Sequence, residues 1–290
     1  MDGKRRLLGK WLLLLICIVV LLAMPATVNG DVGPKPTLKL TLKNLPNAQC
    51  YVDLLVPNVT SNDELNGNRL HQNLNDQIQY DQQLLGRLKN YTEPGWHLAI
   101  TQGTVPPLHG TIVCESIDGK GVMNYSYLGV PDRFKVILVT SDGKLVVSNE
   151  LTRLGFNSYA NFDYNTGKLS EGMPFGAYFL QFLKTCSATL LIEGVVLILF
   201  GFSMRRSWKP FLWINALTQF LLTLVVMVSM LAGGIFMVVL FCALFEIVVF
   251  VLEAKLFKKY LLEQSEERRV RFSIVANTAS LLAWFMIMMI

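Results

Sequence analysis

The chain has 290 residues, of which 52% are hydrophobic and 16% are charged, and its mean hydropathy is +0.41. The apolar residues gather in long runs, which excludes an ordinary soluble globular domain and indicates a membrane protein. The net charge is +5, yet residues 31–178 carry 12 Lys and Arg against 14 Asp and Glu. The excess positive charge lies elsewhere, next to apolar runs, so it records membrane topology and does not predict a nucleic-acid partner.

The first apolar run covers residues 11–28 and follows the basic stretch KRRLLGK. It ends near Val28 and Gly30, which are small enough for signal peptidase. This pattern is typical of a secretory signal, and we expect residues 1–30 to be cleaved from the mature protein. An uncleaved N-terminal anchor is the alternative interpretation.

Residues 31–178 are long enough to form one independent core outside the membrane. The stretch TLKLTLKNL, residues 37–45, alternates polar and apolar residues with a period of two, as a half-buried strand does. Similar stretches follow: CYVDLLV, WHLAI, GTIVCES, FKVILVT and KLVVSNEL. Turn signals at 141–144 (SDGK) and 164–168 (YNTGK) separate or follow them. The sequence predicts a small antiparallel β-sandwich.

A polar stretch at about residues 58–95 interrupts the strand pattern. It is rich in Asn, Gln and Asp, and its apolar residues are spaced loosely like one helix face: Leu70, Leu74, Ile78 and Leu85. We expect a long surface insertion that contains a short amphipathic helix.

Two of the five cysteines lie in strand-like stretches of the outer domain. Cys17 belongs to the signal, and Cys186 and Cys242 fall in apolar runs, so Cys50 and Cys114 form the one pair available outside. An exported pair permits a disulfide. Two reduced thiols buried in the core are the alternative.

The sequence holds no recognisable catalytic or metal-binding constellation. All three histidines precede the C-terminal apolar runs, and none has the paired spacing of a zinc site: His71, His97 and His109. There is no GxSxG motif and no glycine-rich phosphate loop. We therefore expect no cofactor, no metal and no enzyme activity.

Four apolar runs crowd the C-terminal third, at about residues 179–203, 211–230, 235–254 and 272–290. Each approaches the roughly 20 residues that span a bilayer. The first and third connections are basic, MRRSWKP and KLFKKYLLEQSEERRVR, whereas the middle one, LAGG, carries no charge. Since positive connections stay in the cytoplasm, the pattern predicts four spans with residues 31–178 outside the cell membrane. This topology agrees with an N-terminal signal.

The chain resembles a family of uncharacterised Firmicutes membrane proteins over nearly its whole mature length. The resemblance begins with DVGPKPTL at 31–38 and continues through PDRFKVILVT, residues 131–140, and the Ser-Tyr pair at 158–159. In the tail it is carried by IEGVVLILFGF, INALTQ, FEIVVFVLEAKLFKKY and ANTAS. It implies a signal peptide, an exported β domain and a helical membrane region, and it implies no activity. The chain departs from the family in the Asn-rich insertion and at residues 154–157.

The predicted spans contain polar residues, whose burial in hydrocarbon is energetically unfavourable. They are Glu193, Asn215, Gln219, Glu246, Glu253, Asn277 and Ser280. A charge near the bilayer centre costs about 2.5–3.5 kcal/mol or more, so such residues suggest a functional site. The alternative is that they hydrogen-bond between helices and only hold the bundle together, at about 0.6 kcal/mol per contact.

The three carboxylates differ in their expected roles. Glu246 and Glu253 are seven residues apart, close to two helical turns, and therefore share one face. Glu193 and Glu246 lie near the middle of their spans and are the candidate proton or cation sites. Glu253 lies near Lys255, so its side chain is expected to extend to the membrane interface.

Three hypotheses for function follow. The leading one is a non-enzymatic cell-envelope protein, in contact with the lipid bilayer, whose exported β domain binds a cell-surface ligand or protein partner. The second is a small transporter, or transporter subunit, that uses Glu193 and Glu246. The third is an intramembrane enzyme with paired carboxylates.

Overall fold

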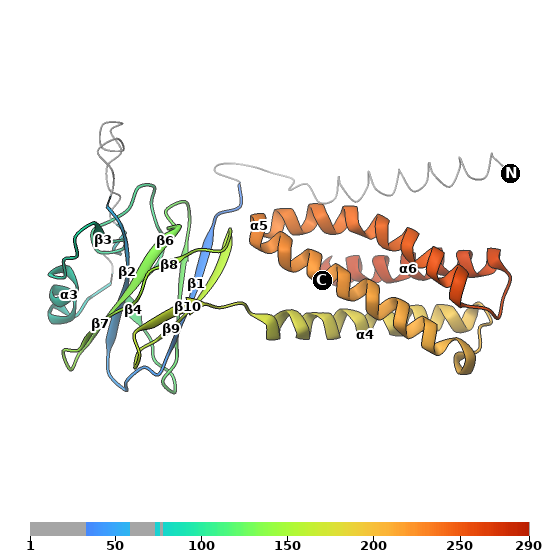
Figure 1. The fold of residues 1–290 in the computed structure, drawn as a ribbon, viewed down its shortest axis with the longest axis horizontal. Coiled ribbons are helices and arrows are strands. Elements are labelled where there is room, and N and C mark those ends of the chain that lie inside the picture. The colour runs from blue at the N-terminus through green and yellow to red at the C-terminus, as the bar shows by residue number, and fades with distance from the viewer. Residues whose placement is uncertain (1–32, 59–72, 76–77, 290) are drawn as a thin grey trace. The chain divides into compact units, whose positions relative to one another are not determined.

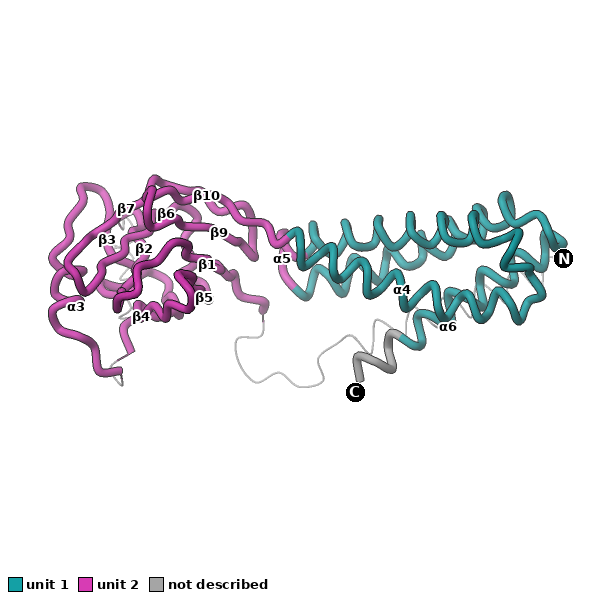
Figure 2. Tube along the Cα trace, turned by 90° about the horizontal axis from the view of Figure 1, so that it is seen from below, with its two compact units in different colours: residues 1–32, 175–229, 235–290 teal, residues 33–174, 230–234 magenta. Residues whose placement is uncertain are grey.

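The computed structural model describes residues 33–58, 73–75 and 78–289. The predicted signal segment and most of the Asn-rich insertion therefore lie outside the described residues. The chain forms two compact units, coloured separately in Figure 2. The β unit comprises residues 33–174 together with 230–234, and the helical unit comprises the described residues 175–229 and 235–289.

Figure 1 labels the strands of the β unit, which are numbered in chain order. They are β1 (Thr37–Lys43), β2 (Cys50–Pro57), β3 (Trp96–Leu98), β4 (Val113–Cys114), β5 (Gly121–Ser126), β6 (Arg133–Thr140), β7 (Leu145–Val147), β8 (Leu151–Thr152), β9 (Asn157–Asp163) and β10 (Lys168–Glu171). One sheet has the order β10-β9-β1-β5, and the other has the order β3-β2-β6-β7, with β4 paired to β2 and β8 paired to β6. Residues from both sheets share one hydrophobic core.

One strand pair contradicts the purely antiparallel arrangement that we predicted. β1 pairs with β9 in parallel, with Thr37 opposite Asn157 and Lys43 opposite Asp163. Parallel neighbours need a long crossover connection. Here the connection is residues 44–156, which include the entire second sheet.

The burial patterns explain why the sequence predicted some strands and missed others. In β1 the three leucines Leu38, Leu40 and Leu42 are buried, while the Thr and Lys residues between them are exposed or half-buried. β9 also alternates, but its buried residues are Ser158, Ala160 and Phe162, so its apolar signal is weak. The sequence analysis did not predict β5, β9 or β10, whereas both predicted turns are present, each with a glycine at positive φ.

The structure contains a short helix within the insertion, as we predicted. α3 (Gln82–Lys89) starts after Asp81, whose carboxylate accepts hydrogen bonds from the backbone N–H groups of Gln83 and Leu84. Its buried face is Leu84, Leu85 and Leu88, which pack into the core of the β unit. Of the spacing residues we named, only Leu85 lies in this helix, and Ile78 is 37% exposed.

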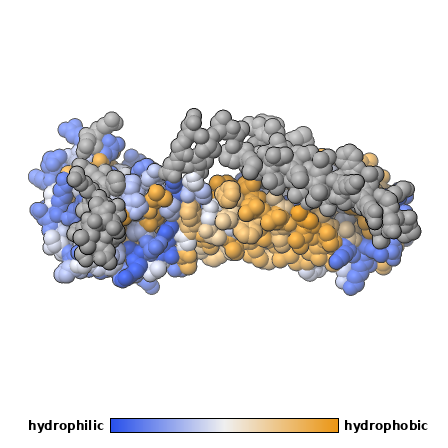
Figure 3. Space-filling view, turned by 90° about the horizontal axis from the view of Figure 1, so that it is seen from above, coloured by the Kyte–Doolittle hydropathy of each residue, from blue (hydrophilic) through white to orange (hydrophobic). Residues whose placement is uncertain are grey.

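The helical unit contains α4 (Phe175–Leu199), α5 (Met204–Tyr260) and α6 (Glu266–Met289). By length and composition, α4 and α5 are each able to cross a membrane. Large apolar side chains on both helices face outward, and Leu191, Leu199 and Trp213 are more than half exposed. Figure 3 shows this as a broad hydrophobic surface over the helices, which is compatible with a lipid environment.

α5 is broken where the sequence predicted the LAGG connection. Gly233 and Gly234 have non-helical backbone angles, and Gly234 has φ +68°, a region that favours glycine. We call residues 204–232 the first arm of α5 and residues 235–260 its second arm. In Figure 1 the two arms run back along each other.

The two basic connections lie at the same end of the helical unit. Glu263, between α5 and α6, accepts hydrogen bonds from the Ser203 N–H at 2.7 Å and the Ser207 hydroxyl at 2.9 Å, at the start of α5. Gln264 donates to the Gly201 carbonyl at 2.8 Å, just after α4. Gly201, at φ +77°, ends α4, and the Phe202 N–H bonds back to the Leu197 carbonyl, as in a Schellman motif.

Candidate functional site

An aromatic layer closes the helical unit near the basic connections. Phe257 packs edge-on against Phe272, with ring centroids 5.2 Å apart, and Phe202 and Phe211 complete the layer. All four rings are buried. They come from the α4–α5 connection, both arms of α5 and α6, so this layer fixes the relative positions of these segments.

A layer of polar side chains lies about one helical turn beyond these rings. Glu193 is four residues from Leu197, Asn215 four from Phe211, Glu253 four from Phe257 and Asn277 five from Phe272. Because 3.6 residues make one turn, these spacings bring the polar residues to a common level. With two neighbouring hydroxyl residues they form what we call the polar cluster: Glu193, Asn215, Thr218, Glu253, Asn277 and Ser280.

Glu253 is the best-satisfied carboxylate of the polar cluster. Its Oε1 accepts a hydrogen bond from Thr218 Oγ1 at 2.6 Å, and its Oε2 accepts one from Asn277 Nδ2 at 2.6 Å. Its side chain is 1% exposed. The expectation that Glu253 extends to the interface is therefore wrong, because two partners on neighbouring helices hold it inside the unit.

Glu193 is equally buried but has fewer partners. Its Oε1 accepts a hydrogen bond from Ser280 Oγ at 3.1 Å, while Oε2 has no hydrogen-bond partner among the described residues. The Asn215 side chain interacts with Glu193, and Asn215 Oδ1 also lacks a partner there. Glu193 is 1% exposed and Asn215 is 0% exposed, so two buried acceptors in one cluster lack a donor.

Five of the seven polar residues predicted from the sequence meet in this cluster, and two do not. Gln219 is half-buried; its backbone carbonyl accepts a hydrogen bond from Thr223 Oγ1, and its side chain forms none with the described residues. Glu246 is half-buried and accepts no hydrogen bond in the described part of the chain, although it interacts electrostatically with Glu253. Thr218 was missed, but its position three residues after Asn215 places it on the same helix face.

The chemistry available to the polar cluster is that of two carboxyls in a low-dielectric setting. Among the described ion pairs, none joins a Lys or Arg to Glu193, Glu246 or Glu253. The described residues also contain no group of three or more His, Cys, Asp or Glu side chains that could hold a metal ion.

The β unit contains a buried carboxylate that the sequence analysis missed. Asp53 on β2 is fully buried and accepts hydrogen bonds from the backbone N–H groups of Leu54, Ile100 and Thr101 and from the Thr101 hydroxyl. Burial raises the pKa of Asp53 to about 6, although these hydrogen bonds oppose the shift. The available signal was one Asp inside the otherwise apolar stretch CYVDLLV.

The predicted cysteine pair is brought together in the β unit. Cys50 on β2 lies directly opposite Cys114 on β4, and both are buried thiols. The hydrogen bond to Cys50 and burial together raise the pKa of the Cys114 thiol. The arrangement places the two residues as neighbours across one strand pair, and the disulfide itself stays a prediction.

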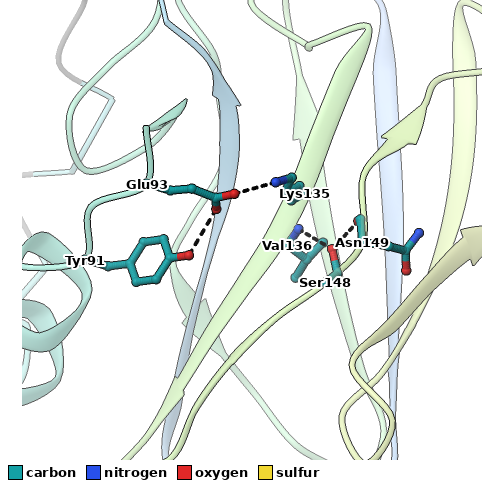
Figure 4. A network of polar contacts seen from close by, with 6 residues as sticks. All are labelled: Tyr91, Glu93, Lys135, Val136, Ser148 and Asn149. Carbon is teal, nitrogen blue, oxygen red and sulfur yellow. Dashed lines mark hydrogen bonds and ion pairs between the residues drawn. The ribbon is translucent and has the colours of Figure 1, made fainter. Parts of the chain in front are cut away.

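The surface of the β unit carries a charged and aromatic network on its six-stranded sheet. Figure 4 shows Lys135 on β6 paired with Glu93 at 2.5 Å, while the Tyr91 hydroxyl donates to the other oxygen of Glu93 at 3.0 Å. Lys135 Nζ also lies 4.4 Å from the centroid of the Trp96 ring. The hydrogen bond from Lys135 lowers the pKa of the Glu93 carboxyl.

An open cavity of about 390 Å³ lies near this network. Its lining residues are Arg87, Asn90, Tyr91, Val139, Gly143 and Leu145. Arg87 is exposed and forms no ion pair among those of the described residues. The cavity therefore has a cationic side chain, Arg87, in its lining.

The described histidines have ordinary structural surroundings. His97 Nε2 lies 3.2 Å from the Gly103 carbonyl, and burial lowers the pKa of its imidazole. His109 stacks on Tyr127, with ring centroids 4.4 Å apart. His71 lies outside the described residues.

Comparison with known proteins does not assign the chain to a family. No protein-family model matches the sequence, and no curated protein matches it significantly.

Proposed function

We propose that the chain is a multi-pass membrane protein that carries a monovalent cation, either a proton or an alkali ion, through its helical unit. The observation that favours this function is the unpartnered pair of acceptors, Glu193 Oε2 and Asn215 Oδ1, inside a cluster with a second buried carboxyl. Glu193 and Glu253 are the proposed ion-binding residues. Glu253 replaces Glu246 in this role because Glu246 lies outside the polar cluster.

The proposed topology places the β unit outside the cell membrane and both basic connections in the cytoplasm. It supposes four spans: α4, the two arms of α5, and α6. Two features support it, namely the basic residues of the α4–α5 and α5–α6 connections and the hydrogen bonds that hold these connections at one end of the helical unit. A cleaved signal at residues 1–30 belongs to the same proposal.

A purely structural role explains the cluster less well. Interhelical hydrogen bonds in membranes are worth about 0.6 kcal/mol on average, and an amide could provide them without a charge. Glu193 and Glu253 interact electrostatically within the same buried cluster, which disfavours two ionised carboxylates there. Burying two titratable carboxyls side by side is unfavourable, and helix packing alone would be served equally well by amides.

Ion binding is tested by the thermal stability of the purified protein in detergent. A ligand that binds only the folded state stabilises it in proportion to the logarithm of its concentration. The unfolding temperature of the wild type should change with pH, or with Na⁺ or K⁺ at constant ionic strength. In E193Q and E253Q that dependence should be reduced, while E246Q, a control outside the polar cluster, should keep it. Equal dependence in all four proteins would contradict the proposal.

A second candidate function belongs to the β unit. We propose that the cavity beside Arg87 binds an anionic group of a cell-surface ligand, because this guanidinium has no carboxylate partner in the described structure. Full-length protein should bind an anionic polysaccharide more tightly than its neutral counterpart, and Arg87→Gln should remove the difference. Equal binding of both polymers by the wild type would end this proposal without affecting the first.

A further inference from the structure

Thr218 is placed to accept or donate a hydrogen bond at Glu253. Its single hydroxyl hydrogen has three acceptors within reach: Glu253 Oε1 at 2.6 Å, and the carbonyls of Ile214 and Asn215, each at 3.1 Å. The hydroxyl hydrogen can form a good hydrogen bond with one of these three acceptors at a time. The hydroxyl can therefore donate to an ionised Glu253, or turn to a helix carbonyl and accept from a protonated one.

Ser280 repeats this arrangement at Glu193. Its hydroxyl lies 3.1 Å from Glu193 Oε1 and 3.1 Å from the Asn277 carbonyl. The same hydroxyl can donate to an ionised carboxylate or accept from a protonated one, without any change in the backbone. Two carboxyls from different helices are thus each paired with a hydroxyl that suits both protonation states.

The second oxygens of the two carboxyls are not alike. Asn277 Nδ2 donates to Glu253 Oε2 and to the Ser273 carbonyl, so both of its hydrogens have acceptors. Glu253 can therefore stay ionised with both oxygens satisfied. Glu193 Oε2 has no donor in the described residues, so Glu193 is the less well satisfied of the two buried carboxyls and the better candidate to carry a proton.

We propose that the ion bound by the polar cluster is a proton, held at Glu193 beside an ionised Glu253, and that Thr218 and Ser280 are positioning residues for its uptake and release. This inference rests on the proposed function and names its ion. Glu253 needs no metal cation to satisfy its oxygens, because each of them already accepts a hydrogen bond, one from Thr218 and one from Asn277.

None of the described groups that face the polar cluster is a basic side chain that could neutralise its carboxylates. Glu193 on α4 interacts with Glu253 and Glu246, both on the second arm of α5. The first arm contributes Asn215 and Thr218, and α6 contributes Asn277 and Ser280. No Lys or Arg forms an ion pair with these carboxylates among the described residues, so a proton is the available counter-charge.

Proton uptake at either carboxyl requires one new bond. An O–H bond of a hydronium ion breaks and leaves water, while an O–H bond forms on the carboxyl. The hydroxyl of Thr218 or Ser280 keeps its own hydrogen, which turns from the carboxyl oxygen to a helix carbonyl. Release reverses both movements. No oxidant, reductant or leaving group takes part.

Infrared spectroscopy of the full-length protein in lipid nanodiscs tests this inference through the carbonyl stretch of protonated carboxyls. During a pH titration, E193Q should lose one titrating carboxyl band, and E253Q should alter the titration of the band that remains. E246Q is the matched control: it removes a carboxyl that lies outside the polar cluster and only interacts electrostatically with Glu193 and Glu253, so the bands of those two should remain. Thr218→Val removes the donor to ionised Glu253 at nearly constant size, so the cluster should hold its proton about tenfold more tightly. Thr218→Ser should restore the wild-type titration.

The outcomes separate this inference from the function on which it rests. If Na⁺ or K⁺ in place of choline weakens proton binding at constant ionic strength, a metal cation competes for the site; the proton assignment then fails, while the proposed ion site stands. If E193Q and E253Q titrate like the wild type, both the inference and the proposed function fail. If Thr218→Val titrates like the wild type, the positioning role of Thr218 is overturned.

Discussion

Asn277 on α6 and Glu253 on α5 meet at 2.6 Å, although 24 residues separate them in the chain. The contact joins the last helix to the second arm of α5 at the level of the polar cluster. Since Asn277 also donates to its own helix at the Ser273 carbonyl, its amide is held in one orientation. The Asn277–Glu253 hydrogen bond therefore fixes the position of α6 against the second arm of α5 at this level.

Substitutions at Glu253 should separate hydrogen bonding from charge. Glu253→Gln keeps an acceptor for Asn277 and a group that can pair with Thr218, so the unfolding temperature in detergent should stay near that of the wild type. Glu253→Leu leaves both partners unpaired where no water replaces the bond, and should cost about 1–2 kcal/mol. A Leu variant as stable as the Gln variant would show that these contacts do not stabilise the bundle.

The sequence predicted the position of this cluster better than its membership. Apolar runs and intramembrane acids were visible directly, and five of the seven polar residues we named are in it. Glu246 and Glu253 share a face, yet only Glu253 lies level with Glu193, because this level depends on how the Phe layer packs the helices. Helical periodicity predicts which residues share a face of one helix, but it does not predict which of them lie level with a residue on a neighbouring helix. The sequence therefore could not distinguish the position of Glu246 from that of Glu253.

The β unit shows the same limit in a different form. β1 was visible because its buried residues are leucines, whereas β9 buries Ser158 and Ala160 and was missed. The parallel pairing of β1 with β9 joins residues 120 apart, such as Thr37 and Asn157. No local pattern encodes a pairing at that distance.

Asp53 should make the stability of the β unit depend on pH. Its folded pKa of about 6 lies above its ordinary value of 3.8, so the folded state binds the proton more tightly. The stabilisation linked to this proton is full below about pH 4 and is lost as the pH rises through about 6, a change on the order of 2–3 kcal/mol. Denaturant unfolding of a fragment of residues 31–178 at several pH values measures it.

Asp53→Asn is the matched control for that titration. It removes the titrating group and points an amide at donors of Ile100 and Thr101, which should cost about 1–3 kcal/mol. The wild-type curve should fall relative to the variant between pH 4 and pH 6. Parallel curves over this range would show that Asp53 does not titrate there.

Cys50 and Cys114 should form a disulfide when the β unit is exported to an oxidising compartment. They are direct neighbours across β2 and β4, and both are buried. Mass spectrometry without reductant should find the fragment two protons lighter than its reduced form. Two thiols that react with an alkylating reagent on unfolding would exclude the bridge.

Both basic connections should be accessible from the cytoplasmic side alone. Glu263 and Gln264 bind the start of α5 and the end of α4, so the connections cannot lie on opposite sides of a membrane while these contacts exist. A single cysteine introduced at Arg205 or at Glu267 should be labelled by an impermeant reagent in inverted vesicles and protected in intact cells. Labelling of either site in intact cells would reverse the topology.

Transport of a proton by the buried carboxyls of the polar cluster can be measured across a membrane. Its most direct test is the decay of an imposed pH gradient in proteoliposomes that hold purified protein and a trapped pH-sensitive dye. Wild type and E246Q should dissipate the gradient faster than empty liposomes, whereas E193Q and E253Q, at equal protein content, should match the empty liposomes. Decay as fast in E193Q as in the wild type would contradict the account.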